Sequence, residues 1–576
     1  MIARRYADLL KRVASCIPTF APNIFSMCRF LVPIFCAFLC ILNLQVNAQN
    51  KDNAPTPLSK NLARPKLVVG LMVDQMRWDF LYRYYDRYSE GGFKRLLREG
   101  FSCENAMIPY AQTVTAAGHA SVYTGSVPAV NGIMGNEWFD RSKNRSVYCV
   151  EDEGVKIVGG SENGEAMSPK NLWTTTISDE LRLATNFRSK VVGVALKDRG
   201  AILAAGHTGD AYWYESKSGN FVTSTHYYPE LPSWVTEFNN NKLADELYAT
   251  DWFTLYPVKT YVQSDKDNVA YEGRFFHEQS PTFPHELKSQ TGVNYGTISS
   301  TPLGNTLTLA FARAAMKAES LGKDNITDLL AVSLSSPDYA GHQFGPNSIE
   351  IEDMYLRLDA ELADFFNHLD KEVGKGEWLF FITADHGVAH TPGFLAKNKI
   401  NVSTLPSNLA ALNKSIDEKF KVPNTIRTSS NYQLFFNYEK LDSAGIKLDD
   451  IIQYAIKELE KDTAIWMAFD TKKLQTANMP EEIKKRFTNG MNPKFSGDIG
   501  FVLKSGYFFG GKTGTTHGSW YPYDAHIPMV FMGWGVKHGS TARPTYMTDF
   551  APTLSALLHI QMPSGNIGQP VTEITD

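Results

Sequence analysis

Four apolar runs of strand length recur along the chain, and each is followed within four residues by a charged side chain. These are 66–73 before Asp74, 190–196 before Lys197, 329–334 before Asp338 and 378–383 before Asp385. An unbroken apolar run is typical of a strand that is buried on both faces, as in a parallel sheet. The carboxyl edge of such a sheet is where open α/β folds bind ligands. The sequence therefore predicts an α/β fold with a mostly parallel sheet and one active edge.

Helices are expected between these strands. A stripe of apolar residues at three- and four-residue spacing predicts a helix over 349–372, and it consists of Tyr355, Leu358, Leu362, Phe365 and Leu369. A further strand is predicted at 527–532 and a late helix at 547–559. The stretches 208–300 and 391–512 do not fit this alternation, and we interpret them as insertions that form a cap or lid.

Six residues of metal-binding type stand at the strand ends or in loops. They are Asp74, Asp338, His342, Asp385, His386 and His517. Carboxylate oxygens and imidazole nitrogens are ligands that zinc accepts, so six of them predict two sites of three ligands each. Asp338 and His342 are four residues apart, which turns both side chains to one side of a helix. Because that spacing alone is common in solvated pairs, the prediction depends on the whole set.

The order of these motifs resembles the alkaline phosphatase superfamily over nearly all of the chain after its leader. The motifs are Leu71-Met-Val-Asp74-Gln, Thr113-Val-Thr115-Ala-Ala-Gly-His119, Ser336-Pro-Asp338-Tyr-Ala-Gly-His342, Thr383-Ala-Asp385-His386-Gly and Gly514-Thr-Thr-His517-Gly. Gly135-Asn136-Glu-Trp and Lys197-Asp-Arg199-Gly make the chain most similar to the periplasmic alkaline phosphatases of the PafA type, which use a Thr nucleophile. That group is close to the type I phosphodiesterases and nucleotide pyrophosphatases. The resemblance implies an α/β/α sandwich.

The resemblance also implies how the metal ligands are shared. One zinc ion would be bound by Asp338, His342 and His517. The second zinc ion would be bound by Asp74, Asp385 and His386. His119, His207, His390 and His526 match no ligand position, so they are expected beside the site or at the surface.

By the same resemblance, Thr115 would be the nucleophile in the hydrolysis of a phosphate monoester. A Thr hydroxyl is a weak nucleophile at neutral pH, and contact with one of the metal ions would stabilise its alkoxide. Its phosphate would then be released by water, which makes the enzyme a transient phosphoprotein. Lys197 and Arg199 alternate in sequence, so on an extended segment both would face the phosphoryl oxygens. Asn136 would add a neutral donor.

Three other functions compete with this interpretation. Phosphodiesterases and nucleotide pyrophosphatases share the two zinc sites and the Thr nucleophile, but Lys197 and Arg199 suit the extra charge of a monoester. Sulfatases are disfavoured because no Cys or Ser with their modification motif stands at the nucleophile position. A non-catalytic exported protein that binds zinc only for stability is an alternative of another class, and the intact Thr115 argues against it.

The first 48 residues are interpreted as a cleaved signal peptide. Basic residues precede the apolar run 30–42, and Val46-Asn-Ala48 offers small residues at the spacing of a cleavage site. A retained membrane anchor is the alternative, but the run is short for a spanning helix. The chain would then be periplasmic or otherwise exported, with no stable membrane span after cleavage. A linker at 49–65 would lead into a catalytic domain at 66–576.

Composition limits the partners of this chain. Its 576 residues are 43% hydrophobic and 20% charged, as in an ordinary globular protein. Removing residues 1–48 takes away five positive charges and one negative charge, so the formal net charge moves from −4 to −8. Such an acidic protein is not built to bind nucleic acid. Of the six cysteines, Cys103 and Cys149 remain, either paired as in an oxidising compartment or buried as thiols.

Overall fold

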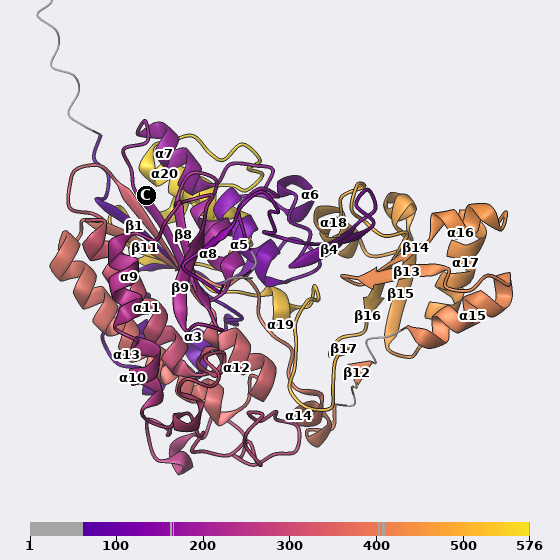
Figure 1. Cartoon of the computed structure of the whole chain (residues 1–576), viewed down its shortest axis with the longest axis horizontal. Coiled ribbons are helices and arrows are strands. Elements are labelled where there is room, and N and C mark those ends of the chain that lie inside the picture. The colour runs from indigo at the N-terminus through magenta and orange to yellow at the C-terminus, as the bar shows by residue number, and fades with distance from the viewer. Residues whose placement is uncertain are drawn as a thin grey trace, which may run out of the picture. The chain divides into compact units, whose positions relative to one another are not determined.

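A ten-stranded sheet forms the centre of the fold (Figure 1). The structure is a computed structural model that describes residues 62–574 apart from 162, 163, 165, 401, 403 and 406–408. The predicted signal peptide at 1–48 and most of the predicted linker at 49–65 lie outside the described residues. In spatial order the strands are β19 (Gly539–Thr541), β2 (Phe101–Cys103), β18 (Met529–Gly533), β11 (Trp378–Thr383), β1 (Leu67–Val73), β10 (Asp328–Leu334), β7 (Val191–Ala195), β8 (Asp210–Glu215), β9 (Asn220–Ser224) and β6 (Ile157–Val158).

The middle of this sheet is parallel. Strands β11, β1, β10, β7 and β8 run in the same direction, and β1 is buried along its whole length. Antiparallel pairs flank this part, since β18 pairs with both β11 and β2, and β9 pairs with β8. The predicted α/β class with a mostly parallel sheet is therefore confirmed. The four strands predicted from apolar runs correspond to β1, β7, β10 and β11, within one residue at each end.

Helices cover the sheet in two groups (Figure 1). One group packs around β10 and β18 and consists of α4 (Phe93–Glu99), α11 (Pro302–Ala318) and α13 (Ile349–Leu369). The other packs around β7 and β8 and consists of α5 (Thr115–Thr124), α7 (Ile177–Ala184), α8 (Asp198–Ala205) and α20 (Phe550–Leu558). Figure 1 shows the two groups on either side of the sheet, as in the α/β/α arrangement that the resemblance implies.

The predicted helices differ slightly from the observed ones. The helix expected over 349–372 is α13, which ends at Leu369 and continues as a π-helical turn over Asp370–Gly374. The helix expected over 547–559 is a 3₁₀ turn at Met547–Asp549 followed by α20. The strand expected at 527–532 is β18, and it runs antiparallel to β11.

Close packing in the sheet centre requires a glycine in β1. A Cβ atom at Gly70 would lie 2.4 Å from Phe381 Cζ and 2.7 Å from the Tyr123 hydroxyl. Phe381 belongs to β11 and Tyr123 to α5, so a side chain at position 70 would push apart the strand and the helix that carry site residues. The glycine keeps α5 close to the sheet.

The stretch 208–300 is not an insertion throughout. Its first part forms β8 and β9, which extend the central sheet. These strands have polar ends and aromatic residues, so they lack the unbroken apolar run that predicts the other strands. The rest of the stretch holds the short helices α9 (Ser233–Asn240) and α10 (Leu243–Tyr248) and 3₁₀ turns.

The stretch 391–512 forms a small sheet with its own apolar core, drawn in orange in Figure 1. The sheet is antiparallel in the order β13 (Ile426–Ser430), β14 (Gln433–Phe436), β16 (Ile499–Leu503) and β15 (Ile465–Asp470). Helices α15 (Ala410–Phe420) and α17 (Leu448–Leu459) pack on it. We refer to residues 391–512 as the inserted sheet.

Among the described residues, none of the helices has the length and apolar content to cross a membrane. Cys103 and Cys149 are both buried free thiols, which decides between the two alternatives left open by the sequence.

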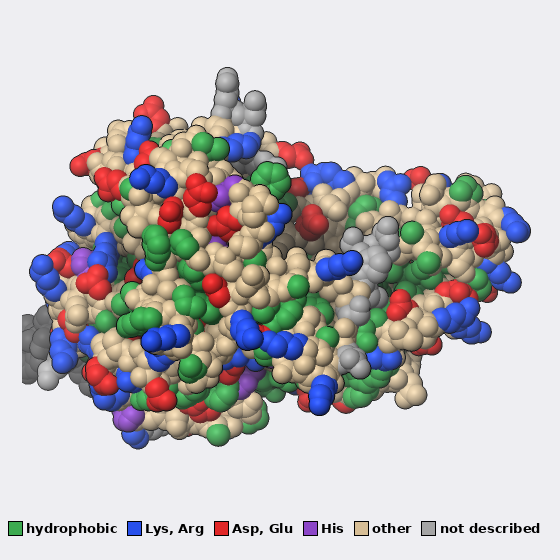
Figure 2. Space-filling model, turned by 90° about the horizontal axis from the view of Figure 1, so that it is seen from below, with side chains coloured by type: hydrophobic (Ala, Val, Ile, Leu, Met, Phe, Trp, Pro, Cys, Tyr) green, Lys and Arg blue, Asp and Glu red, His purple; other side chains and the backbone are tan. Residues whose placement is uncertain are grey.

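Figure 2 shows one face of the molecule, on which Lys and Arg side chains are interspersed with Asp and Glu side chains. Long-range attraction of an anionic ligand by a patch of one sign is therefore not expected from this face.

Candidate active site

The carboxyl ends of four neighbouring strands bring the predicted site residues together. Asp74 follows β1 directly, and Asp385 lies two residues beyond β11. Asp338 lies in the first turn of α12 (Ser336–Phe344), which begins shortly after β10. Lys197 follows β7. Since β11, β1, β10 and β7 are adjacent and parallel, the sheet itself explains why residues so far apart in sequence meet.

Asp338, His342 and His517 form the first candidate metal group. The Asp338 Oδ1 atom lies 3.2 Å from His342 Nε2 and 3.5 Å from His517 Nε2. The other ring nitrogens are held by backbone, since His342 Nδ1 donates to the Thr515 carbonyl at 2.9 Å and His517 Nδ1 donates to the Thr113 carbonyl at 2.7 Å. Each ring is thereby fixed with Nε2 toward the carboxylate, which is the arrangement found around metal ions.

A second group surrounds His386. Three of its atoms are buried without a hydrogen-bond partner: Asp74 Oδ1, Asp385 Oδ2 and His386 Nε2. His386 Nε2 lies 3.6 Å from Asp74 Oδ1 and 3.7 Å from Asp385 Oδ2. Asp385 Oδ2 also lies 3.4 Å from His119 Nδ1. Buried polar atoms are costly when they lack a hydrogen bond, so these three atoms around one point fit a bound cation. These are the residues that the sequence assigns to the second zinc ion.

Asp338 lies between the two groups. Its Oδ1 atom faces the two histidines of the first group, and one of its carboxylate oxygens lies within 4.8 Å of ligand atoms of Asp74 and His386. The rings of His386 and His517 stack with their centroids 3.4 Å apart. The two groups are therefore contiguous, whereas the sequence assigns Asp338 to the first group alone.

The sequence-based geometry for Lys197 and Arg199 is wrong. The segment is not extended, because α8 begins at Asp198 and places Arg199 in its first turn. The apolar residues from 200 to 205 are buried and favour a helix that starts directly after Lys197. The two cations therefore do not lie on one side of an extended segment, and they have different partners.

Lys197 is buried beside the Thr115 hydroxyl and the carboxylates. Its Nζ atom lies 2.7 Å from Asp74 Oδ2, 2.5 Å from Asp338 Oδ2 and 3.4 Å from Thr115 Oγ1. Burial alone would lower the pKa of Lys197, but the two carboxylates outweigh it and raise that pKa. Lys197 is thus a cation that neutralises the ligand carboxylates in the structure.

Arg199 is held by a tyrosine that the sequence did not single out. Its Nη1 atom donates to the Tyr148 hydroxyl at 2.9 Å, and that hydroxyl donates to Asp198 Oδ1 at 2.6 Å. Tyr148 comes from β5 (Arg145–Tyr148), which is paired with β4 (Glu137–Asp140). One edge of the Arg199 guanidinium is therefore fixed. Tyr148 lies in a hairpin outside the recognised motifs, so the sequence offers no signal for this role.

Thr115 is the first residue of α5 and is only 1% exposed. The next backbone amide, Ala116 N, donates to Asn136 Oδ1 at 2.9 Å, which brings the Asn136 amide beside Thr115. The rival hydroxyl of Thr113 donates to the Ser519 carbonyl at 2.7 Å. Thr115 is therefore the hydroxyl close to the buried cation, while Thr113 is engaged in the loop after His517.

The candidate ligand residues differ in the direction of their pKa shifts. Burial, reinforced by Asp338 and Asp385, raises the pKa of Asp74 well above its ordinary value. Burial also opposes ionisation of Asp338, but His342 and Lys197 outweigh it and hold its pKa well below the ordinary value. Burial lowers the pKa of His386 and that of His517. A neutral imidazole is the form that binds metal.

The remaining histidines do not offer ligand atoms to either group. His119 is fully buried, with Nδ1 2.9 Å from the Thr115 carbonyl and Nε2 2.8 Å from Ser333 Oγ, so it ties α5 to β10. His207 is bonded to Asp179 and the Leu172 carbonyl, His390 to Asn347 and Arg77, and His526 to the Glu104 carbonyl.

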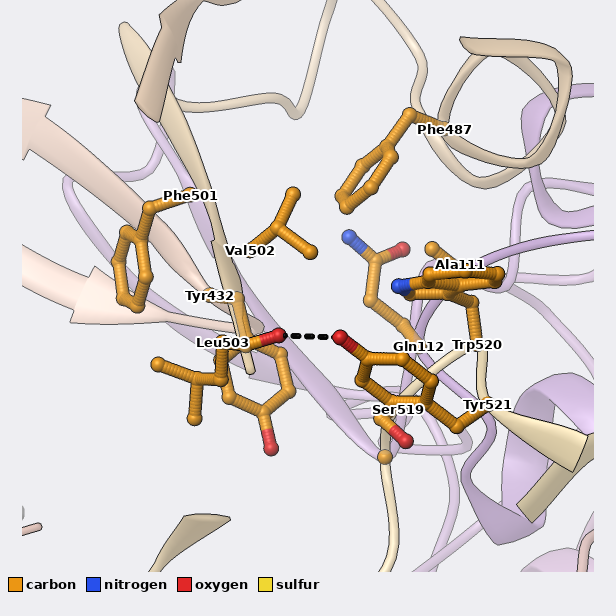
Figure 3. Close-up of a pocket in the computed structure, with 11 residues that line it drawn as sticks. Ala111, Gln112, Tyr432, Phe487, Phe501, Val502, Leu503, Ser519, Trp520 and Tyr521 are labelled. Carbon is orange, nitrogen blue, oxygen red and sulfur yellow. Dashed lines mark hydrogen bonds between the residues drawn. The ribbon is translucent and has the colours of Figure 1, made fainter. Parts of the chain in front are cut away.

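A small cavity lies beside the site, lined by residues next to the site and by residues of the inserted sheet (Figure 3). Gln112 lies three residues before Thr115, Ser519 lies two residues after His517, and Leu503 belongs to β16. Figure 3 shows the Tyr521 hydroxyl bonded to the Leu503 carbonyl, at 2.8 Å. The cavity of about 20 Å³ has room for about one water molecule, so it is too small to bind a substrate. The residues around it pack the inserted sheet against the site.

Comparisons with known proteins support an assignment to one family. A family model described as type I phosphodiesterase / nucleotide pyrophosphatase matches residues 68–526. The alkaline phosphatase PhoV of Synechococcus elongatus is 51% identical over 95% of this chain and 99% of its own length. The alkaline phosphatase PafA of Elizabethkingia meningoseptica is 50% identical over 89% of this chain and 94% of its own length. A crystal structure of wild-type alkaline phosphatase PafA matches with a TM-score of 0.88 and 50% identity, over 90% of this chain and 100% of that one.

Proposed function

Because the chain belongs to the type I phosphodiesterase / nucleotide pyrophosphatase family, within the alkaline phosphatase superfamily, and is an alkaline phosphatase, we propose that it hydrolyses phosphate monoesters through a covalent phosphothreonine at Thr115 and with two zinc ions. The observation that carries the proposal is the trio of buried, unpartnered atoms around His386, beside a helix that begins at Thr115.

The residues fit two zinc ions. Three aspartates and three histidines are the hard oxygen and borderline nitrogen donors that zinc accepts, and the histidines have their other ring nitrogens fixed by carbonyls. His342 and His517 would hold one ion with Asp338. His386 would hold the other with Asp74 and Asp385. Two bound divalent ions would supply charge neutralisation at the attacking and departing oxygens.

The chain's own residues would position the phosphate. The Thr115 hydroxyl attacks phosphorus from the start of α5, where helix amides favour an anion. The Asn136 side chain accepts from Ala116 N through its oxygen, so its NH₂ group is left to donate to a phosphoryl oxygen. Arg199, held by Tyr148, offers its remaining N–H groups to the same phosphate.

Lys197 adds positive charge to this set. Its ammonium already touches the Thr115 hydroxyl and two carboxylates, so a metal-loaded site would free it to turn toward the phosphate. Metal ions bound to Asp74 and Asp338 would neutralise these carboxylates in place of Lys197. Lys197 would then contribute one of the charge-assisted contacts that a dianionic monoester can use.

A side-by-side assay tests the proposal. An aryl phosphate monoester and the matching diester are offered to the purified enzyme before and after chelation, and again after zinc is returned. We expect the monoester to be strongly preferred, chelation to abolish turnover, and zinc to restore it. Full turnover by the metal-free enzyme would rule out the zinc mechanism.

Hydrolysis of diesters is the competing activity, and one observation favours it. The pairing of Lys197 with Asp74 and Asp338 leaves Arg199 as the cation less engaged with carboxylates. If Lys197 keeps this pairing when metal is bound, the site offers less charge to a monoester. Faster turnover of the diester in the same assay would establish this alternative.

Export is part of the proposal. The basic residues and the apolar run within 1–48 are the support for it. Expression with the full leader should yield a secreted or periplasmic chain that begins near residue 49, as read by N-terminal mass spectrometry. An intact leader on the active enzyme would contradict cleavage.

A further inference from the structure

Gln75, the residue after Asp74, bonds to two other ligand residues. Its backbone N–H donates to Asp385 Oδ1 at 3.1 Å, and its side-chain Nε2 donates to Asp338 Oδ1 at 2.6 Å. A weaker contact of 3.4 Å joins Nε2 to the Asp338 carbonyl. Gln75 is 2% exposed, so these are buried contacts that water does not replace. One residue, which itself follows β1, thus connects the carboxylates that follow β10 and β11.

The oxygen that accepts from Gln75 is the one that faces the histidines. Asp338 Oδ1 lies within 3.5 Å of both His342 Nε2 and His517 Nε2. A carboxylate oxygen has two lone pairs, so it can accept from the amide and still face a metal ion. The hydrogen bond therefore restricts rotation of the Asp338 carboxylate about its last side-chain bond.

The backbone at Gln75 is in a conformation that a glutamine rarely adopts. Its φ of 67° lies in the left-handed region, which glycine occupies without strain. Such positions persist where the surroundings enforce them, and they concentrate at functional sites. A glycine at 75 would relieve the backbone strain but would have no side-chain amide to donate to Asp338.

A glycine opposite Gln75 provides the space for its side chain. Gly341 lies in α12 between Asp338 and His342. A Cβ atom there would lie 1.8 Å from Gln75 Oε1, 2.9 Å from its Cδ and 3.6 Å from its Nε2, and these are its three nearest atoms. Glycine is a poor helix former, so helix stability does not explain its presence inside α12. The space for the Gln75 amide does.

We propose that Gln75 is a positioning residue that fixes the Asp338 and Asp385 carboxylates for metal binding, and that Gly341 is the gap that admits its amide. This inference rests on the proposed metal-dependent function. Groups that orient metal ligands typically change metal affinity or activity 10- to 100-fold when they are removed, and we expect a loss of about that size for zinc. Substrate affinity should change less than turnover, because Gln75 contacts ligands rather than phosphate.

Gln75→Met tests the amide, since methionine has a similar length and no N–H donor. Zinc affinity is measured by competition with a chromophoric chelator, together with kcat, KM and the Tm of the metal-free and zinc-loaded protein. We expect about 10- to 100-fold weaker zinc binding, a lower kcat, and a metal-free Tm close to that of the wild type. Gln433→Met is the matched control, because Gln433 is also buried but bonds to Gly497 in the inserted sheet.

Gly341→Ala tests the same contact from the opposite side. Alanine strengthens the helix but displaces the Gln75 amide, so zinc binding should weaken although α12 is favoured. In the Gln75→Gly background the displaced side chain is gone, and Gly341→Ala should cause no further loss. Such a double-mutant cycle isolates the contact between the two positions.

Three results would overturn the inference. They are unchanged zinc affinity in both single variants, additive losses in the double variant, or a Tm that falls equally with and without zinc, which would indicate a purely structural role. If the wild type itself binds no zinc, the proposed function fails instead, so the two failures are distinguishable.

Discussion

At the scale of single residues, the choice between two hydroxyls is explained by their partners. Thr113 Oγ1 is engaged with the Ser519 carbonyl, and the Thr113 carbonyl holds the ring of His517. Thr115 stands at the start of α5 with its hydroxyl toward Lys197. One threonine therefore supports the site and the other is available for reaction.

We expect phosphate to be trapped on Thr115. Enzyme quenched in acid during turnover, digested and mapped by mass spectrometry should carry the modification there, and Thr115→Ala should abolish both the modification and turnover. Thr113→Val is the comparison, since it removes the other hydroxyl and leaves Thr115 in place. Phosphate on Thr113, or on neither residue, would contradict the assignment.

Replacing Lys197 and Arg199 together with Ala should separate monoesters from diesters. Charge-assisted contacts are worth about 1.5 to 3 kcal/mol each, so losing two should lower kcat/KM for a monoester by roughly two to four orders of magnitude. A diester has an alkyl group in place of one charged oxygen and should lose far less.

Tyr148→Phe provides the graded comparison for this pair. It removes only the hydroxyl that holds Arg199, so it should reproduce a small part of the loss for the monoester. Equal losses for monoester and diester in the double variant would show that the two cations serve structure.

At the scale of elements, the strands could be predicted where burial on both faces leaves an unbroken apolar run, as in β1 and β11. β8 could not, since its ends are acidic and its middle is aromatic. The start of α8 could not be predicted either. The alternation of Lys197 and Arg199 predicts an extended segment, and only the buried residues after them favour a helix. Charged residues at a helix start conceal the periodicity on which prediction depends.

The segment after β9 contains a buried acid that should make stability depend on pH. Glu272 is 6% exposed and its Oε2 atom has no hydrogen-bond partner. Burial, with a further effect from Glu350, raises its pKa to about 10. A carboxyl whose pKa rises on folding is stabilising while protonated, so this contribution is complete below pH of about 4 and is lost as pH rises toward 10.

Glu272→Gln should therefore flatten the pH dependence of unfolding. The free energy of unfolding in urea, measured at pH 6 and pH 9 at constant free zinc, should fall less in the variant than in the wild type. Glu286→Gln, at an exposed neighbouring position, is the control. An identical fall in wild type and variant would show that Glu272 does not dominate this dependence.

At the scale of the whole molecule, the candidate ligand set could be predicted because each ligand lies in a recognisable short motif. Their supporting contacts could not, since the carbonyls of Thr113 and Thr515 that hold His517 and His342 leave no trace in side-chain type. The position of Asp338 between the two groups also depends on the packing of α12 against α11 and α13, which no local pattern encodes.

Metal removal should lower both stability and activity. Without a cation, Asp74, Asp338 and Asp385 remain buried close together, with Lys197 bonded to two of them. Zinc at 100 times its Kd would add about 2.7 kcal/mol per site to the free energy of unfolding, so chelation should lower the Tm. Asp385→Ala should retain about one zinc ion per chain and no activity. Unchanged Tm after chelation would argue against structural coupling.

The distance in sequence between Asp74 and His517 has a consequence for biosynthesis. The first candidate ligand is made early and the last is His517, so no nascent product that stops before His517 can complete both proposed metal sites. Joining such remote segments is a late step in folding, since the ordering of the intervening chain has to come first. Phosphatase activity thus reports that synthesis has passed His517, and a chain released before that residue would be inactive rather than partly active.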